Sequence, residues 1–324
     1  MAILTAGLRK LGSGVRKIAA NPNYLGQARP DTPFFAGLYR HSMEAIHPLS
    51  YWSRRRMATA LASEAEARID PEVGFLKRDL LSHPAVEAAL RTCDSVRSED
   101  DFFEIVNLSR KKCLQSFELD INNTKYSSIF KLACDPVLLS CVCDHMETVP
   151  VLHRAIISYS PNEILEGETQ LYHMDYEDTK QIKCSIFLEE VTHDTGPLTI
   201  IPARESSEIF EILRQKGQAR RRLQYFDDEQ IYGTGRVKEG SEITGPRGTV
   251  LFADTCNCFH FGSRPGKGPR FLLYFHYSSA FSVEMPVQQL GKTEIPEHLR
   301  AEGREGRIAE MVLGLYGSHL ARAR

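Results

Sequence analysis

Three residues of the sequence have the types and the spacing to hold one metal ion: His173, Asp175 and His260. Side chains two positions apart on an extended strand point to the same face, so His173 and Asp175 can offer a nitrogen and an oxygen to one point. His260 would add a second imidazole from another strand. Two histidines and one carboxylate leave three positions of an octahedral metal open, and this is the ligand set of non-haem Fe(II) oxygenases.

A cation in the same part of the chain is placed to bind a carboxylate. Arg270 opens the apolar stretch 270–277, where a positive charge needs a buried partner. A guanidinium group holds a carboxylate by two charge-assisted hydrogen bonds. We therefore expect Arg270 to bind a dicarboxylic co-substrate, and Ser263 in the preceding loop to donate a hydrogen bond to the same carboxylate.

Other residues of the same types compete for these roles. His276 follows on the strand that Arg270 opens, and we expect it in the core behind the site rather than on the metal. Glu177 and Asp178 continue an acidic turn and lack the spacing of a ligand pair on one strand. Arg264 and Lys267 lie in a loop rich in glycine and proline, where a cation is usually solvated.

The order of these residues resembles that of the phytanoyl-CoA dioxygenase-like (PhyH) family of Fe(II)/2-oxoglutarate-dependent oxygenases. The resemblance covers roughly residues 130–280 and rests on four pieces: His173 with Asp175, the stretch 196–202, the strand 248–252 that leads to His260, and Arg270. It implies an α+β fold, in which flanking helices, mostly from the N-terminal half, surround a double-stranded β-helix (a jelly roll, or cupin-like barrel).

The resemblance also implies the chemistry. Fe(II) would be held by His173, Asp175 and His260, with 2-oxoglutarate as co-substrate and O2 as oxidant, and Arg270 would anchor the far carboxylate of 2-oxoglutarate. The expected activity is hydroxylation of a small organic substrate with decarboxylation of 2-oxoglutarate to succinate. The alternative is a non-catalytic or cupin-like metal-binding protein that uses the barrel mouth to bind a ligand or partner. The identity of the substrate is left open.

The composition agrees with an ordinary globular enzyme. The chain has 324 residues, of which 42% are hydrophobic and 25% charged, with a formal net charge of −2. A net charge this small gives no electrostatic field that would attract nucleic acid. The sequence has no apolar run of about 18 residues, so no membrane span is expected. Eight cysteines without a secretory signal favour reduced thiols and a cytoplasmic location. The oligomeric state is left open.

The pattern along the chain divides it into three parts. Residues 1–29 are basic and acid-free, which is typical of a surface helix or frayed tail, or alternatively of a mitochondrial import segment. Residues 30–282 form the expected catalytic jelly-roll domain, and residues 283–324 a tail with one helix. Within the domain, residues 30–50 read as irregular, helices follow, and several short strands come after Pro150.

Two further features leave their roles open. The charged, helical stretch 205–232 interrupts the strands, and a long insertion of this kind is often a lid or binding loop. Three arginines at 54–56 and three at 220–222 form clusters that either make surface salt bridges or hold an anionic group of the substrate. Lys183 lies on the polar face of its strand, where it is either a surface lysine or reaches the pocket.

Overall fold

The computed structural model describes residues 33–165, 167–175, 178–219, 224–283, 285 and 287–316. The basic segment 1–29 and the arginines 220–222 lie outside the described residues. The predictions of a tail or import segment, of the cellular location and of a role for the second arginine cluster are therefore untested, as are the proposed domain boundaries.

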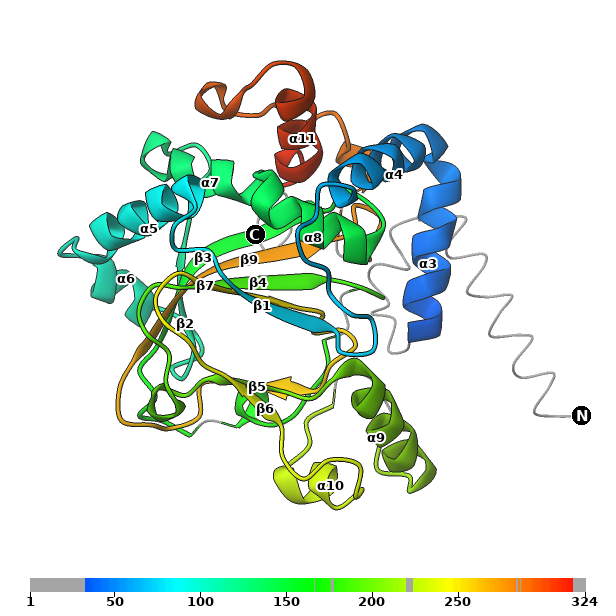
Figure 1. Ribbon diagram of the computed structural model, residues 1–324, viewed down its shortest axis with the longest axis vertical. Coiled ribbons are helices and arrows are strands. Elements are labelled where there is room, and N and C mark those ends of the chain that lie inside the picture. Colours follow the sequence, from blue (N-terminus) through cyan, green and yellow to red (C-terminus); the bar gives the residue numbers. More distant parts are fainter. Residues whose placement is uncertain are drawn as a thin grey trace, which may run out of the picture.

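Two antiparallel sheets face one another, and helices cover the outer face of the larger sheet (Figure 1). The larger sheet has the strand order β1 (Phe75–Asp79), β7 (Thr249–Ala253), β4 (Ile182–Phe187), β9 (Arg270–Ser278), β3 (Val151–Ser160) and β2 (Gln115–Glu118). The smaller sheet has the order β6 (Ser241–Ile243), β5 (Leu198–Ile200) and β8 (His260–Phe261). The expected mixture of helices and antiparallel strands is confirmed.

Nine α-helices lie among the described residues: α3 (Pro33–Ile46), α4 (Pro48–Ala62), α5 (Pro84–Arg97), α6 (Phe102–Asn107), α7 (Ser127–Ala133), α8 (Pro136–Met146), α9 (Ala203–Gln215), α10 (Asp228–Tyr232) and α11 (Gly303–Leu313). Short 3-10 turns occupy Thr124–Tyr126, Glu168–Gln170, His193–Thr195, Val287–Gln289 and Glu297–Leu299. Proline begins several helices, because its missing N–H is not needed there. At α8 the Asp135 carboxylate accepts a hydrogen bond from the Val137 N–H, as an N-cap does.

Strand β9 separates the core from the interior between the sheets. Its alternate residues Leu273, Phe275 and Tyr277 pack into the main core against the covering helices. Arg270, Leu272 and Tyr274 point to the other face and line a cavity. This period of two is the expected geometry of a strand, and it places the predicted anchor residue Arg270 inside the molecule rather than on its surface.

One prediction about the N-terminal half is wrong. Residues 30–50 are not irregular, because α3 begins at Pro33 and buries Tyr39 and Met43 against the loop after β9. Helices dominate the region that follows, as expected, but β1 and β2 also lie before Pro150 and form both edges of the larger sheet. β1 has the sequence Phe-Leu-Lys-Arg-Asp, and its solvent-facing charges interrupt the alternation of apolar and polar residues that would predict a strand.

The insertion 205–232 packs mainly beneath the smaller sheet. Ile209 and Leu213 of α9 and Ile231 of α10 join Phe226 in a second apolar cluster against that sheet. Of the described residues in this segment, Tyr225 lines the cavity. α9 and α10 therefore support the smaller sheet instead of closing over the cavity as a lid.

Within the first arginine cluster, Arg54 has a structural role that neither interpretation of the sequence anticipated. Arg54 is buried, and its guanidinium donates hydrogen bonds to the backbone carbonyls of Val149 and Met311. These bonds tie α4 to the start of β3 and to α11. Arg55 is on the helix surface, where it donates to the Tyr51 hydroxyl and lies 4.0 Å from the Glu147 carboxylate, as the salt-bridge interpretation expects.

Among the described residues no single helix is long and apolar enough to cross a bilayer. One pair of segments, Thr124–Ala133 and Pro136–Met146, meets at a bend of 46° and together has the length and composition of a span, by those two measures only.

Candidate metal centre and co-substrate pocket

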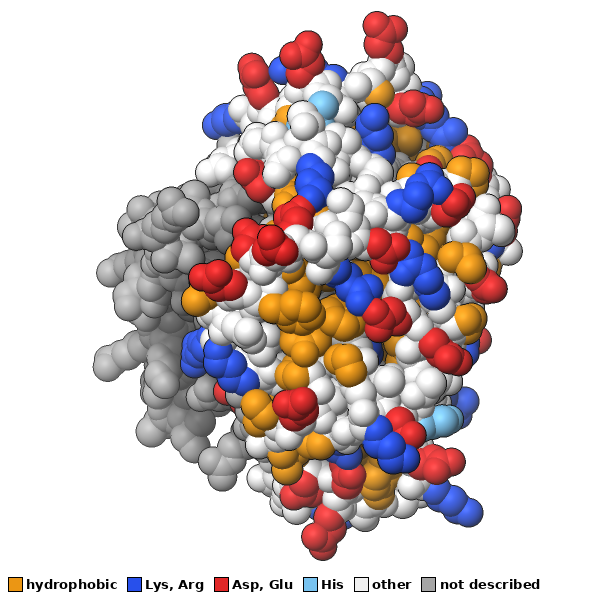
Figure 2. All heavy atoms as spheres, turned by 90° about the vertical axis from the view of Figure 1, so that its left-hand side faces the viewer, with side chains coloured by type: hydrophobic (Ala, Val, Ile, Leu, Met, Phe, Trp, Pro, Cys, Tyr) orange, Lys and Arg blue, Asp and Glu red, His pale blue; other side chains and the backbone are white. Residues whose placement is uncertain are grey.

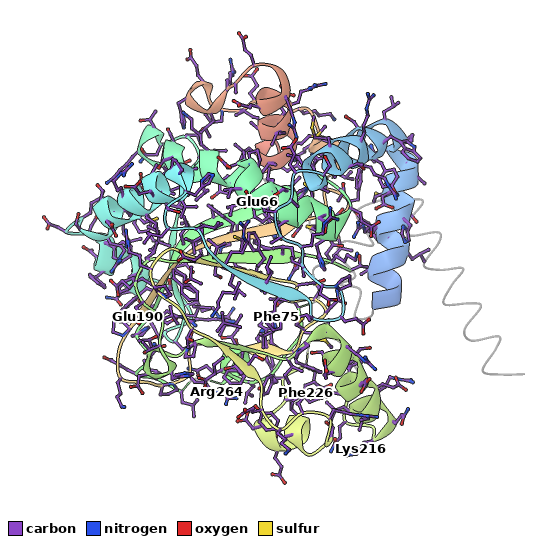
Figure 3. All side chains as sticks on the ribbon, in the orientation of Figure 1. Glu66, Phe75, Glu190, Lys216, Phe226 and Arg264 are labelled. Atoms are coloured by element: carbon purple, nitrogen blue, oxygen red, sulfur yellow. The ribbon has the colours of Figure 1, made fainter. Side chains whose placement is uncertain are left out.

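A cavity of about 970 Å³ lies between the two sheets and contains every predicted site residue. Such a volume is at the upper end of the range for small-molecule sites. Side chains from both sheets project toward this interior, while Arg264 and Phe226 lie beside the smaller sheet (Figure 3). The predicted residues are thus brought to one place by both sheets.

His173 and His260 are directly opposite one another on neighbouring extended segments. Each backbone N–H donates to the carbonyl of the other, at 3.1 and 3.0 Å, and the imidazole centroids are 4.3 Å apart. Each ring has its Nδ1 atom close to a carbonyl two residues earlier, of Leu171 at 2.9 Å and of Cys258 at 3.0 Å. A carbonyl only accepts, so Nδ1 carries the proton and Nε2 of each ring keeps a free lone pair for a metal.

Asp175 completes the group. One ligand atom from each of His173, Asp175 and His260 lies within 4.8 Å of the other two, and all three residues are buried. The Asp175 N–H donates to the Thr255 carbonyl at 2.9 Å, which fixes the backbone of the ligand. Its Oδ2 atom lies 3.9 Å from the Nε2 atom of His260. The spacing His173-x-Asp175 therefore does what the strand geometry predicts.

The charge states of the three residues suit a metal site. Burial lowers the pKa of His260 to about 3, with the neighbouring His173 adding to the effect. Burial likewise lowers the pKa of His173. Burial alone would raise the pKa of Asp175, but the Lys183 ammonium and the two imidazoles outweigh it and the pKa is lowered. Near neutral pH the site thus offers two neutral imidazoles and a carboxylate, the forms that bind metal.

Two donors hold the Asp175 carboxylate from behind. Its Oδ2 atom accepts hydrogen bonds from the Gln181 amide at 3.0 Å and from the Lys183 ammonium at 2.5 Å. Gln181 is fully buried, donates a second bond to the Thr255 hydroxyl, and lies 2.8 Å through its Oε1 atom from the His276 Nε2 atom. His276 is therefore behind the site, as expected, where it orients Gln181. Sequence reasoning missed Gln181, since a glutamine at the start of a strand carries no distinguishing signal.

Arg270 is buried, and no acidic partner lies beside it in the part of the chain that the structure describes. It is 6% exposed, and its Nη2 atom donates to the hydroxyls of Ser263 at 2.8 Å and Ser160 at 3.5 Å. Its Nε atom has no hydrogen-bond acceptor among the described residues. Burial lowers the pKa of Arg270 to about 10. A buried guanidinium with an unsatisfied N–H fits a carboxylate that enters the cavity.

The loop before Arg270 has a defined shape that aims Ser263. Ser263 has φ 60°, in the left-handed region that is rare for residues other than glycine. Its N–H donates to the carbonyl of Gly196 at 3.3 Å. Gly196 also has φ 60°, and a Cβ atom there would lie 2.6 Å from the Arg264 carbonyl oxygen. The Gly-Pro turn noted in the sequence thus supports the loop that carries Ser263.

The competing residues have other partners. Asp178 accepts hydrogen bonds from the backbone N–H groups of Thr179 and Ser279 and lies 3.6 Å from Arg40 of α3. Arg264 was expected to be solvated, but it is only partly exposed: its guanidinium lies 3.4 Å over the Phe261 ring and pairs with Asp228. Lys267 is exposed and pairs with Asp194, and Glu177 lies outside the described residues.

No family model and no curated protein matches the chain. Among solved structures it is similar to HygX from Streptomyces hygroscopicus, with nickel and 2-oxoglutarate bound, at 14% identity over 65% of this chain and 84% of that chain (TM-score 0.42). It is also similar to EctD from S. alaskensis, with 2-oxoglutarate and 5-hydroxyectoine, at 18% identity over 66% and 82% (TM-score 0.43). Another similar structure is that of SnoK, a non-heme alpha ketoglutarate dependent carbocyclase from nogalamycin biosynthesis, at 15% identity over 64% of this chain and 81% of that chain (TM-score 0.38). A likeness of this degree assigns neither a family nor an activity to this chain.

Proposed function

We propose that this protein is an Fe(II)- and 2-oxoglutarate-dependent dioxygenase that hydroxylates a small organic substrate. One observation carries the proposal: a buried group of two histidines and one carboxylate shares a cavity with a buried arginine that lacks an acidic partner among the described residues. Two histidines and a carboxylate are the ligand set of non-haem Fe(II) oxygenases. The arginine supplies what a dicarboxylic co-substrate needs at its far end.

Six residues of the site would then have defined tasks. His173, Asp175 and His260 hold the iron, and Gln181 keeps the Asp175 carboxylate in place. Arg270, with Ser263, binds the far carboxylate of 2-oxoglutarate and fixes its direction in the cavity. When bound, iron and 2-oxoglutarate would supply, with O2, the oxidant for a C–H bond: one oxygen atom would enter the substrate and the other succinate, and CO2 would be released. The surrounding sheets exclude water from the reaction.

We also propose that the two sheets form a double-stranded β-helix. The two facing sheets, with the site in the space between them, suit a double-stranded β-helix of the PhyH type. The stretch 196–202, the strand that leads to His260, and Arg270 hold positions around one cavity that agree with the resemblance of the sequence. Residues 30–282 would form this catalytic unit.

An anaerobic titration tests the function. Fe(II) and 2-oxoglutarate added to the wild-type protein should produce the charge-transfer absorption of the iron chelate, and His173→Ala should abolish it. His193→Ala is the matched control, because His193 is exposed and pairs with Glu242 away from the cavity. On admission of air, the wild-type protein and His193→Ala should release succinate, and His173→Ala should not. Absence of the absorption from the wild-type protein would leave the alternative, a metal-binding or scaffold protein without 2-oxoglutarate chemistry.

A further inference from the structure

Among the described residues, Lys183 is the charged side chain of the cavity interior that would contact neither iron nor 2-oxoglutarate. It projects from β4 toward the interior and lines the cavity, with its side chain 21% exposed. Its ammonium lies 2.5 Å from the Asp175 Oδ2 atom. On the neighbouring strand it is opposite His276, so it belongs to the inner face of the larger sheet.

Two of the three other cations of the cavity wall have acidic partners. Arg154 pairs with Glu118, and Lys111 lies 3.3 Å from Glu168. Arg110 lies at the exposed mouth. The interior thus holds one negative charge, on Asp175, and two positive charges, on Lys183 and Arg270.

Loading the site does not remove this excess. The two charges of Fe(II) and the two of the 2-oxoglutarate dianion cancel, so the interior keeps one positive charge in excess. The Lys183 side chain is mostly buried, and an uncompensated charge is costly where it is shielded from bulk water. A substrate that carries one negative charge would offset it.

Lys183 is the residue that can turn to such a substrate. A divalent cation on Asp175 neutralises the carboxylate and repels the ammonium beside it. Gln181, a neutral donor on the same Oδ2 atom, can keep the carboxylate in place by itself. The lysine side chain is flexible and carries three donors, so it can follow an anion into the cavity. Arg270, in contrast, is occupied by the co-substrate.

The rest of the cavity wall suits an apolar body. Ile105, Leu108, Leu114 and Phe117 line it from α6 to β2, and Leu272 lines it from the sheet. Leu108 is 81% exposed at the mouth. On this side of the molecule hydrophobic side chains gather near the middle of the face, bordered by charged ones (Figure 2). Exposed apolar side chains at the entrance to a cavity mark a binding surface for apolar groups.

We propose that the substrate is an organic acid with an apolar body and a single carboxylate, and that the carboxylate binds Lys183. This inference rests on the proposed function, because it requires iron on Asp175 and 2-oxoglutarate on Arg270. Lys183 then sets specificity by charge, and the wall from α6 to β2 holds the apolar part.

The test compares matched probes on the loaded protein. Decanoate, decanol and decylamine share one apolar chain and differ in the charge of the head group. Each is titrated anaerobically into protein with Fe(II) and 2-oxoglutarate bound, and binding is measured by calorimetry while the chelate absorption is followed. The proteins are wild type, Lys183→Met, Lys183→Arg, and Lys267→Met as a control at an exposed lysine outside the cavity.

Decanoate should bind wild type at least about tenfold more tightly than decanol, as expected for a charge-assisted hydrogen bond. Lys183→Met should abolish this preference and keep the chelate absorption, Lys183→Arg should retain the preference, and Lys267→Met should match wild type. The inference is overturned when wild type binds decanoate no better than decanol or binds neither, or when decanoate displaces the chelate. It is also overturned when Lys183→Met keeps the preference or loses the chelate, which would make Lys183 a support for Asp175. A wild-type protein without chelate absorption would instead refute the proposed function itself.

Discussion

Replacing Arg270 by methionine should stabilise the free protein and weaken the binding of 2-oxoglutarate. Burial lowers the pKa of Arg270 to about 10, and at about 1.4 kcal/mol per pH unit this lowering costs the charged form roughly 3 kcal/mol. Methionine fills a similar space without that cost, and Ser263 and Ser160 keep their own hydrogen bond at 2.8 Å. We therefore expect the free energy of unfolding of the free protein to rise by about 1–3 kcal/mol.

The effect on binding has the opposite sign. Loss of one partner of a buried charge pair costs about 2–5 kcal/mol, which corresponds to roughly 30-fold to several thousandfold weaker binding of 2-oxoglutarate. Urea unfolding of the free protein and anaerobic titration of its Fe(II) form measure the two quantities. Arg264→Met is the control, since Arg264 stacks on Phe261 and pairs with Asp228, and it should leave the affinity for 2-oxoglutarate unchanged. A variant Arg270→Met that is less stable and binds 2-oxoglutarate normally would show that Arg270 is a structural residue.

Three further perturbations test the metal site. Asp175→Ala should abolish Fe(II) binding in calorimetry while the circular dichroism spectrum stays that of wild type, and an undiminished affinity would remove Asp175 from the ligand set. Gln181→Leu should weaken Fe(II) binding by about 10–100-fold, because the carboxylate loses its neutral donor; an affinity within twofold of wild type would deny it that role. The pKa of His260 is about 3 in the folded protein against 6.5 for the ordinary side chain, so the unfolded chain takes up the proton first and stability falls as the pH drops below about 6.5. Metal-free protein should lose up to about 1.4 kcal/mol per pH unit from this residue in urea unfolding between pH 6 and 4, and an unchanged slope in His260→Gln would contradict the assignment.

Much of the fold follows from local signals in the sequence. The alternation in β9 and the Asp-Pro start of α8 depend on residues within one or two turns or strand repeats, so the sequence contains all that decides them. The sequence does not reveal α3, because Tyr39 and Met43 form an apolar face only when they pack against the loop after β9. Arg54 was equally hidden, since its acceptors are backbone carbonyls 95 and 257 residues away.

The candidate site likewise combines local features with features that depend on the tertiary fold. Both histidines place Nδ1 against the carbonyl two residues earlier in their own segment, so the local backbone sets the ring tautomer and the direction of Nε2. That contact is local, but His173 and His260 lie 87 positions apart, so the prediction that they meet depended on the order of residues in the family resemblance. The carboxylate differs, because Gln181 and Lys183 follow Asp175 by six and eight positions, and no strand or helix period places their donors on it. The contact of Lys183 with Asp175 is thus the part of the site that only the tertiary fold decides.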